Sequence, residues 1–425
     1  MFIPRIAFIF ILLFVTTSCD NQSIIKPGEP VQDSVGSEKI KIEVWHTYSE
    51  QETKIFENEI IPLFEKEKPN IDVIPVRQSY NEQLMSAIVS RASANKPPDI
   101  VRMDIAWIGK FADLELLYPV NKFEDFDKLK NRFYEEPLNA TKYQEDYYGL
   151  PLNTNTKISI YNRDQLNKFG ITKPPETMEE LINIVENNQD LTLGLTGVDA
   201  WYILPYFYGL GGKITNQHFT KAIGYLDSVE SIRAVSKLVE LYKNGNINPN
   251  LLSGHPNLWE GIRTGEYFMI DEGPWFYSVN SKNEISKINA ETVSAPFPTH
   301  NGTGSVLGGE HLVISKGTKQ LEASWEFLKW MTSEVPQEML LKTGLLPTNK
   351  NVKMDIFLKE FPYYKDYIDS LDQTFLRPSV PEWGKVEEVF NRNLRQIFTE
   401  RISVEEGLSK AAAEIDLLLG KKKGS

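Results

Sequence analysis

Two short segments place aromatic and polar side chains directly after predicted strands. The first, Trp45 to Ser49, follows the alternating run Ile40 to Val44. The second, Met103 to Trp107, follows the run Asp99 to Val101. Such strands, separated by helical patterns, predict a sheet with parallel strands, and ligands bind beyond the carboxyl ends of those strands. The two segments therefore predict a site built from aromatic rings and hydrogen-bonding groups.

Sequence motifs for covalent, phosphate or metal chemistry are absent. No Gly-x-Ser-x-Gly elbow occurs, and the run Gly209 to Lys213 is followed by Ile214, where a phosphate loop needs Ser or Thr. A carboxylate pair for sugar hydrolysis stays open, because the 58 acidic residues allow many pairs and none stands out. We expect no catalytic residue, no metal site and no cofactor. The five histidines lack metal-ligand spacing: His46, His218, His255, His300 and His311.

The single cysteine, Cys19, ends an apolar N-terminal segment. The apolar run Ile6 to Val15 is only about half of a membrane-spanning length, so residues 1–18 predict an export signal. A signal that ends in a lone cysteine is typical of bacterial lipoproteins, although Thr16 stands where they usually carry Leu; an ordinary signal peptide is the alternative. Residues 19–38, rich in Pro, Gly, Ser and acidic side chains, predict a flexible linker. We expect a palmitate-type lipid anchor on Cys19, on the periplasmic or outer face of the membrane.

Composition limits the classes of fold and partner. Residues 39–425 exceed one hydrophobic core of ordinary size, so two domains are expected. The hydrophobic fraction of 41% is typical of a soluble globular body, and the lone cysteine excludes an intramolecular disulfide. The formal net charge of −12 argues against nucleic acid as a partner.

Helical patterns lie between the predicted strands and at the end of the chain. Ser49 and Glu52 have the spacing of a capping box, and Pro62 predicts a kink or an early break in the helix that follows. The run Ile71 to Val76 predicts a second strand. Residues 386–397 and 403–420 predict two C-terminal helices, each with one apolar face.

From residue 40 to the end, the chain resembles the bacterial extracellular solute-binding proteins of the maltose, trehalose and maltodextrin type, which serve ABC importers. The resemblance is carried by several ordered segments and by no single short motif. These segments are VWHTYSEQE, LFEKEKPNIDV, PPDIVRMDIAWIGKFAD, GLPLNTNTKISIYNRDQL, PPETMEELI, IRTGEYFMIDEGPWFYSVN, VLGGEHLVISKGTKQLEASWEFLKWMTS and LRPSVPEWGKVEEVFNRNLRQIF.

The resemblance implies a two-lobe α/β fold of the periplasmic-binding-protein type (type II), with mixed sheets flanked by helices, three crossovers and a ligand cleft between the lobes. It assigns residues 39–153 and 297–347 to the N-terminal lobe, and residues 154–296 and 348–421 to the C-terminal lobe. Closure of the cleft would be a hinge motion.

The resemblance also implies a set of ligand-binding residues. A sugar has flat C–H faces and a rim of hydroxyls, so its site needs aromatic platforms and planar polar groups. Packing, turn or helix-end roles are the alternatives for Trp201, Tyr206, Trp383, Arg377, Asn153, Asn155 and Glu50. The implied set is Tyr48, Glu50, Asp104, Trp107, Asn153, Asn155, Trp201, Tyr206, Trp275, Gly309, Glu310, Arg377 and Trp383.

We therefore expect an exported, monomeric receptor that captures a mono- or oligosaccharide and delivers it to ABC permease subunits. The sequence departs from the family at Gly308-Gly309-Glu310, where many relatives have an aromatic residue after the glycines. A carboxylate at that position favours a smaller or more polar sugar than maltodextrin. Two alternatives stay open: a receptor of the same fold for a polyamine or an anion, and a surface carbohydrate-active enzyme.

Overall fold

The computed structural model describes residues 38–253, 256–378 and 380–420. Cys19, the predicted signal, nearly all of the predicted linker, and His255 lie outside the described residues. The described fold belongs to one compact unit that begins at Lys39. Within it, two separate sheets organise the chain.

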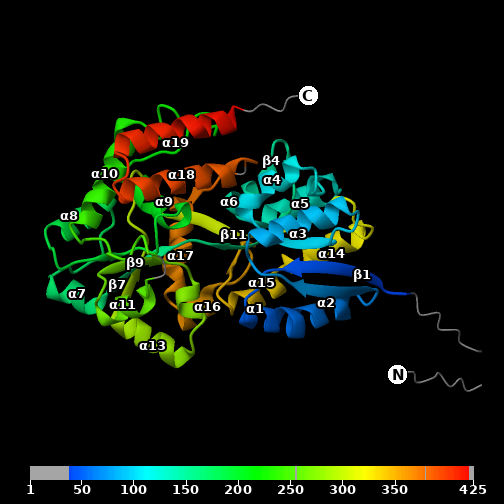
Figure 1. The fold of residues 1–425 in the computed structure, drawn as a ribbon. Helices are drawn as coiled ribbons and strands as arrows, with labels where there is room; N and C mark the ends of the chain where they lie inside the picture. Colours follow the sequence, from blue (N-terminus) through cyan, green and yellow to red (C-terminus); the bar gives the residue numbers. More distant parts are fainter. Residues whose placement is uncertain (1–37, 254–255, 379, 421–425) are drawn as a thin grey trace, which may run out of the picture. The chain divides into compact units, whose positions relative to one another are not determined.

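The first sheet has seven strands in the order β12-β6-β11-β3-β1-β2, with β13 paired to β11 (Figure 1). Strands β2, β1 and β3 run parallel, as the alternating pattern predicts, whereas β11 runs antiparallel to both β3 and β6. The strands are β1 (Ile40–His46), β2 (Ile71–Arg77), β3 (Ile100–Asp104), β6 (Leu150–Asn155), β11 (Val306–Ile314), β12 (Leu346–Pro347) and β13 (Phe375–Leu376).

Strands β1 and β3 are longer than the sequence pattern predicts. Asp104 pairs with Glu310 of β11, and His46 pairs with Arg77 of β2, so both ladders continue past the expected ends. The segment after β3 is therefore not a loop from Met103 onwards: Met103 and Asp104 belong to the strand, and a 3₁₀ turn, η2 (Ile105–Trp107), follows. Strand β3 extends this far because it pairs with β11, which lies about two hundred residues later in the chain. A local alternation pattern cannot reveal such a partner.

Alternate residues of the first sheet face two separate cores, as expected for a sheet covered on both sides. Val44 packs with helices α2, α14 and α15, whereas the next residue, Trp45, packs with α3 and α4. Figure 1 shows α2 and α3 on opposite sides of β1. The helices are α2 (Ile61–Glu67), α3 (Glu82–Ser93), α4 (Ile108–Asp113), α14 (Leu321–Met331) and α15 (Glu334–Leu341).

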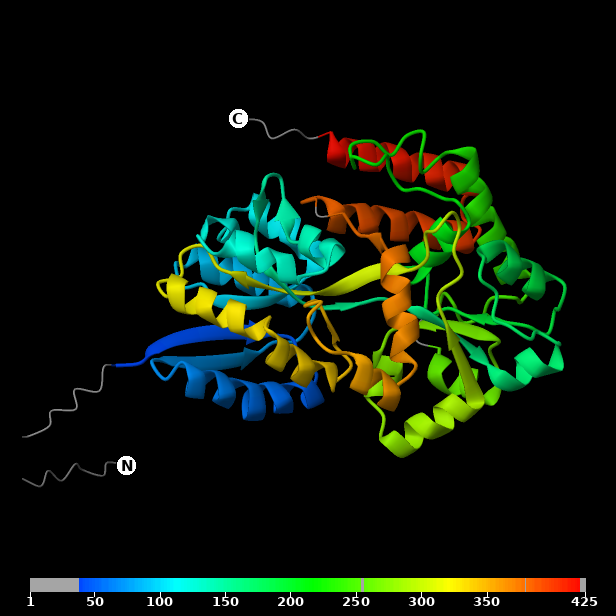
Figure 2. The ribbon, with the colours of Figure 1, turned by 180° about the vertical axis from the view of Figure 1, so that it is seen from behind.

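The second sheet has four strands in the order β10-β7-β9-β8. One face packs on α11, α13 and α17, and the other packs on α8, α9, α10, α18 and α19 (Figure 2). The elements are β7 (Ile158–Asn162), β8 (Leu193–Gly194), β9 (Met269–Glu272), β10 (Thr292–Ala295), α8 (Met178–Glu186), α9 (Ala200–Gly209), α10 (Val229–Lys243), α11 (Leu258–Thr264), α13 (Lys282–Glu291), α17 (Tyr364–Ser370), α18 (Trp383–Phe398) and α19 (Val404–Leu419).

Short elements complete the described chain. A hairpin pairs β4 with β5, and the rest are single turns or short helices. They are η3 (Val120–Lys122), α5 (Phe126–Leu129), η4 (Lys130–Arg132), α6 (Glu135–Asn139), β4 (Lys142–Tyr143), β5 (Asp146–Tyr147), α7 (Arg163–Lys168), α12 (Trp275–Ser278), α16 (Asp355–Glu360) and η5 (Leu371–Gln373).

The first helix confirms the predicted capping box and shows how the chain accommodates Pro62. The Ser49 hydroxyl accepts a hydrogen bond from the Glu52 amide at 3.3 Å, and the Glu52 carboxylate accepts one from the Ser49 amide at 2.7 Å. Helix α1 (Glu50–Ile55) then continues through one π-helical segment, η1 (Phe56–Ile60), into α2. Because Pro62 has no N–H, it fits in the first turn of α2, and the wider turn before it replaces the break that the sequence predicts.

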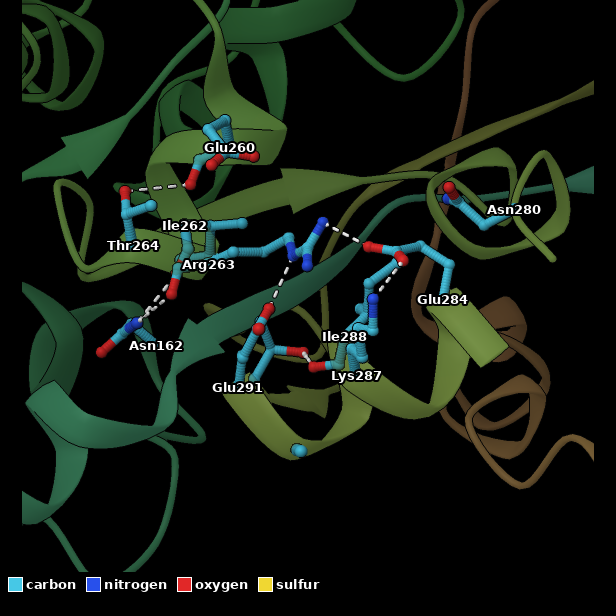
Figure 3. A network of polar contacts seen from close by, with 12 residues as sticks. Asn162, Glu260, Ile262, Arg263, Thr264, Asn280, Glu284, Lys287, Ile288 and Glu291 are labelled. Atoms are coloured by element: carbon cyan, nitrogen blue, oxygen red, sulfur yellow. Dashed lines mark hydrogen bonds and ion pairs between the residues drawn. The ribbon is translucent and has the colours of Figure 1, made fainter. Parts of the chain in front are cut away.

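Beside the second sheet, one arginine connects two helices at the protein surface. Arg263 of α11 donates to Glu291 at 2.6 Å and lies 2.8 Å from Glu284, both on α13 (Figure 3). Behind it, the Asn162 amide at the end of β7 donates to the carbonyl of Ile262 at 2.9 Å. The network fixes α11 and α13 on the same face of the second sheet.

Candidate ligand-binding site

A cavity of about 620 Å³ lies at the carboxyl ends of β1 and β2. Its walls come mostly from the elements built around the first sheet, here called the first lobe, and Trp275 of α12 comes from those built around the second sheet, the second lobe. The position agrees with the general rule for parallel strands, and it includes the segment after β1 that the sequence singles out. The lining residues are Thr47, Tyr48, Ser49, Glu52, Arg77, Gln78, Ser79, Tyr80, Arg102, Asn155, Trp275, Glu310 and Leu345.

Arg102, in the middle of β3, is the central charged group of the cavity wall. It is only 4% exposed and forms an ion pair with Glu310 at 2.9 Å. Its guanidinium also donates to the hydroxyl of Thr47 at 2.8 Å and to Asn153 Oδ1 at 3.1 Å, and it lies 4.5 Å from the ring centroid of Tyr48. The guanidinium therefore holds together side chains from the segment after β1 and from β6 and β11.

Glu310 points into this cluster because the pairing of β11 with β6 shifts register between Glu310 and His311. A local irregularity of this kind turns a side chain away from the regular alternation. The Asn153 amide donates to Glu310 Oε2 at 2.6 Å. Burial raises the pKa of the Glu310 carboxyl, and the positive charge of Arg102 opposes that effect. Both contacts, from Arg102 and from Asn153, are made to Oε2 of this carboxylate.

A second buried ion pair joins Asp104 to Arg377. Arg377 is 8% exposed, and its Nη2 lies 3.1 Å from Asp104 Oδ1. Asp104 also accepts hydrogen bonds from the Tyr80 hydroxyl and the Ala106 amide, each at 2.7 Å. Two residues that the sequence assigns to the ligand therefore bind each other. Arg377 thus has a carboxylate partner on β3, which differs from the helix-end role that the sequence offers as its alternative.

The aromatic residues of the predicted site differ in what they offer to a ligand. Trp275 lines the cavity, and its indole Nε1 donates to Glu272 at 2.5 Å. Trp107 is stacked on Tyr80, with ring centroids 5.3 Å apart and an interplanar angle of 11°. Tyr80 therefore covers one face of Trp107 and itself presents a ring to the cavity.

Glycines near the site are required by close contacts. A Cβ on Gly273 would lie 2.3 Å from the indole of Trp275, and a Cβ on Gly308 would lie 2.2 Å from Asn155 Oδ1. Gly309 has φ +136°, and a Cβ there would lie 2.3 Å from the carbonyl oxygen of Asn153. Larger residues at positions 273 and 308 would displace Trp275 and Asn155, which both line the cavity. Gly309 thus shapes the site through its backbone.

Four other residues of the predicted set do not line the cavity. Glu50 is exposed and forms an ion pair with Lys54 at 2.8 Å. Trp383 is 3% exposed in the core of the second lobe, and Tyr206 is fully buried there, with its hydroxyl donating to Asp271 at 2.9 Å. Trp201 packs beside Gly308, next to the wall.

Several wall residues have no counterpart in the predicted set. Gln78, Ser79 and Tyr80 follow β2 directly, so the rule that placed the segment after β1 could also have found them. Arg102 is an arginine inside a buried apolar strand, which is itself an unusual signal. The full group that the prediction missed is Thr47, Ser49, Glu52, Arg77, Gln78, Ser79, Tyr80, Arg102 and Leu345.

A larger cavity, of about 1150 Å³, lies between the end of α9, the start of α10, the turn at His300 and β13. It contains none of the sequence-predicted site residues. The part of the chain described here holds no group of three His, Cys, Asp or Glu side chains suited to a metal ion. No helix among the described residues is long and apolar enough to cross a membrane.

Comparisons with known proteins agree with this architecture. The maltotriose-binding protein of Pyrococcus abyssi is 25% identical over 393 residues, covering 88% of this chain and 82% of that protein. The multiple sugar-binding protein of Streptococcus mutans is 24% identical over 319 residues, covering 70% of this chain and 72% of that protein.

Solved structures show the same fold. The GacH receptor of Streptomyces glaucescens has a TM-score of 0.74 at 24% identity, covering 91% of this chain and all of that one. The sugar-binding protein MalE of Xanthomonas citri has a TM-score of 0.77 at 20% identity, covering 90% and 98% of the two chains. The two-lobe α/β fold is thereby confirmed. The family described as bacterial extracellular solute-binding protein matches residues 59–365, and the chain belongs to that family.

Proposed function

We propose that this protein is an extracytoplasmic receptor that captures a neutral mono- or oligosaccharide between its lobes and delivers it to an ABC-type importer. The observation that carries the proposal is the cavity beside β1 and β2, whose wall combines aromatic rings with hydroxyl, amide and guanidinium groups. Rings pack on the C–H faces of a sugar, and the polar groups bind its hydroxyls. The sugar-binding relatives support the same ligand class.

The charge balance of the site favours a neutral ligand over a polyamine. A polyamine needs carboxylates that are free to bind its ammonium groups. Here Glu310 is paired with Arg102, and Asp104 is paired with Arg377. The same pairing opposes an anionic ligand, because both buried guanidinium groups already have a carboxylate partner. Neither of these carboxylates therefore supports the polyamine alternative.

The enzyme alternative also loses support at this site. Hydrolysis of a glycosidic bond uses two carboxyl groups, one as general acid and one as base or nucleophile. In the cavity wall, Glu310 is held by Arg102 and Asn153, and the Glu52 carboxylate caps its own helix. Incubation of the purified protein with oligosaccharides and analysis for new products checks this directly. Turnover would contradict the receptor function.

The domain arrangement follows the same proposal. The N-terminal lobe comprises residues 39–153 and 297–347, and the C-terminal lobe comprises residues 154–296 and 348–421. Strand β13 lies in the second range yet pairs with β11 of the first sheet. Trp275 would approach the first lobe when the hinge closes, because it is contributed by the second lobe. The closed form would then be the one that the permease recognises.

Lipid attachment at Cys19 would hold the receptor close to its permease. A monomer on a flexible linker could open, close and dock while remaining at the membrane. Labelling of cells with radioactive palmitate, followed by isolation of the protein, should mark the wild-type chain. The variant Cys19→Ser should remain unlabelled. Label on the variant would contradict acylation at this residue.

A thermal-shift screen tests the ligand class. The panel contains neutral mono- and oligosaccharides, spermidine, and inorganic phosphate. A sugar at 100 times its Kd should stabilise the protein by about 2.7 kcal/mol, which is a readily measured rise in Tm. If spermidine or phosphate raises the Tm and no sugar does, the sugar assignment is wrong. Trp275→Ala should reduce the shift at the same sugar concentration without changing the Tm of the free protein by a comparable amount.

A further inference from the structure

The crossover from the first sheet to the second contains a buried ammonium group that the candidate site does not include. Thr156 and Lys157 alone connect the end of β6 to the start of β7. Lys157 is only 1% exposed. Lysine is among the residues most rarely buried, and it is buried only when paired. The position of this lysine at the hinge therefore requires a physical explanation.

The partners of Lys157 all belong to the second lobe. Its Nζ forms an ion pair with Asp271 of β9, and Asp271 also accepts a hydrogen bond from the Tyr206 hydroxyl at 2.9 Å. The ammonium lies 5.6 Å from the ring centroid of Trp201 and 5.5 Å from that of Tyr202. A cation within about 6 Å of an aromatic face is attracted to it, most strongly when both groups are removed from water.

Trp201 connects this buried cluster to the wall of the candidate site. A Cβ on Gly308 would lie 2.9 Å from the outer edge of the Trp201 indole and 2.2 Å from Asn155 Oδ1. Trp201 and Asn155 therefore flank the same glycine, and Asn155 lines the cavity. The guanidinium of Arg377 lies 5.0 Å from the Trp201 ring centroid. The indole thus lies next to cations from the crossover and from the segment after β13.

Stability alone is a weak explanation for such a pair. A buried ion pair often contributes no more than an apolar pair of similar volume, because both charges lose their hydration. What an ion pair does provide is a fixed geometry. In this case, the fixed group beside the ammonium is the indole next to Asn155.

We propose that Lys157 is a positioning residue for ligand binding. Through Asp271, it is fixed at the crossover, and its ammonium holds the Trp201 indole against Gly308, so that Asn155 keeps its place in the cavity wall. Lys157 does not touch the ligand. The inference rests on the proposed sugar-receptor function, because it deepens the account of that same site.

The test separates positioning from simple stabilisation. Lys157→Met leaves Asp271 buried without its cation, so this variant should unfold at a lower temperature than the wild type. In the double variant Lys157→Met/Asp271→Asn, neither charge remains, and the introduced amide oxygen still accepts from Tyr206, so the Tm should recover. Its affinity for maltotriose, measured by titration calorimetry, should nevertheless stay roughly tenfold weaker than that of the wild type, because no cation from the crossover faces Trp201. The partly exposed ion pair of Lys68 and Glu326 lies outside the cavity wall and provides the matched control, Lys68→Met/Glu326→Gln, which should bind as the wild type does.

A ligand-free readout keeps the inference testable whichever sugar binds. Protein labelled with 5-fluorotryptophan gives one ¹⁹F NMR signal per tryptophan, and Trp201→Phe identifies the signal of Trp201. In the double variant, that signal should shift and broaden, while the Trp330 signal stays in place. An unchanged Trp201 signal, or wild-type affinity in the stable double variant, would overturn the proposal. A wild-type protein that binds no sugar would count against the proposed function alone, since the NMR result would still decide whether Lys157 positions Trp201.

Discussion

At the level of single residues, Arg102 is the cation that neutralises the buried carboxylate in the wall of the candidate site. Its guanidinium compensates Glu310 and at the same time contacts Thr47 and Asn153. Removal of one partner from a buried pair leaves the other charge without compensation, and this costs more than the pair contributes. The site is therefore more sensitive to loss of Arg102 than to loss of both charges together.

Arg102→Met should lower the free energy of unfolding by about 3–5 kcal/mol, measured by urea denaturation, because Glu310 is left buried and charged. The double variant Arg102→Met/Glu310→Gln should recover part of that loss. Sugar affinity should fall in both variants, since both remove hydrogen-bonding groups from the cavity. A change of stability below about 1 kcal/mol in Arg102→Met would show that Glu310 is solvated without its partner.

Two buried histidines predict a dependence of stability on pH. Burial, with the nearby charges of Arg102 and Arg77, lowers the pKa of His46 from 6.5 to about 4, and burial lowers that of His311 from 6.5 to about 3. Glu57 lies 3.5 Å from His46, and the Asp104 charge partly opposes the effect on His311. Below pH 6.5 the unfolded chain binds protons that the folded chain does not bind. The contribution of these histidines to the free energy of unfolding is therefore complete above pH 6.5, and it is lost as the pH falls toward their pKa values in the folded protein.

Each histidine should contribute a slope of up to about 1.4 kcal/mol per pH unit in this window. Urea denaturation at a series of pH values below 6.5 measures the slope for the wild type and for His311→Met. The variant should show the shallower dependence, and Val229→Ala, an exposed substitution of a residue that does not titrate, should match the wild type. Equal slopes in all three proteins would contradict the assignment.

Single residues also show where prediction from sequence ends. Tyr48, Asn155, Trp275 and Glu310 belong to the predicted set and line one cavity, because the resemblance assigns whole ordered segments of the chain to the site. Whether Asp104 and Arg377 face a ligand or each other depends on the pairing of segments 273 residues apart. That information is tertiary, and no local pattern contains it.

At the level of elements, the contact between α11 and α13 supports the second sheet from its surface. Arg263 binds two carboxylates of α13, Glu284 and Glu291, at 23% side-chain exposure (Figure 3). Lys287 also binds Glu284, but it is 65% exposed. The partly buried guanidinium with two carboxylate partners should contribute more to the free energy of unfolding than the exposed i,i+3 pair, because it is better ordered and less hydrated.

Arg263→Met should therefore lower the free energy of unfolding by about 1 kcal/mol, and Lys287→Met by less than about 0.5 kcal/mol. Both variants should bind sugar like the wild type, because neither residue lines the cavity. Urea denaturation combined with calorimetry measures the two effects on the same samples. Loss of sugar affinity in Arg263→Met would mean that the packing of α13 is coupled to the position of α12.

Elements were predictable where their determinants are local. The capping box at Ser49 and the parallel strands β1, β2 and β3 agree with their sequence patterns. Strand β11 was not predicted as the antiparallel strand between β3 and β6, because its apolar run is compatible with any buried strand. The π turn before Pro62 also differs from the expected break, since tertiary packing of Phe56 and Ile60 keeps the chain helical there.

At the level of the whole molecule, the two sheets provide separate cores, and the ligand site draws on both lobes. Separate buried clusters cover both faces of the first sheet and one face of the second, and the cluster on the remaining face of the second sheet also takes in Leu341 of α15 and Leu346 of β12, where the two lobes meet. The first lobe supplies most of the cavity wall, and Trp275 is the aromatic contribution of the second. A ligand that contacts both lobes shifts the population toward the closed form by its difference in affinity for the two forms.

Binding of a sugar should therefore make the wild-type protein more compact, and small-angle X-ray scattering measures this as a lower radius of gyration at saturating sugar. Trp275→Ala should bind more weakly and, at the same sugar concentration, stay closer to the radius of the free protein. Trp330→Ala is a suitable control, because that indole lies in the first-lobe helix α14, donates to Glu67 at 3.0 Å and is absent from the cavity wall. If Trp275→Ala closes as fully as the wild type at low sugar concentration, contact with the second lobe through this indole does not drive closure. Because a ligand can shift the equilibrium only by its differential affinity, closure would then have to be driven by contacts of the ligand with other residues of the second lobe.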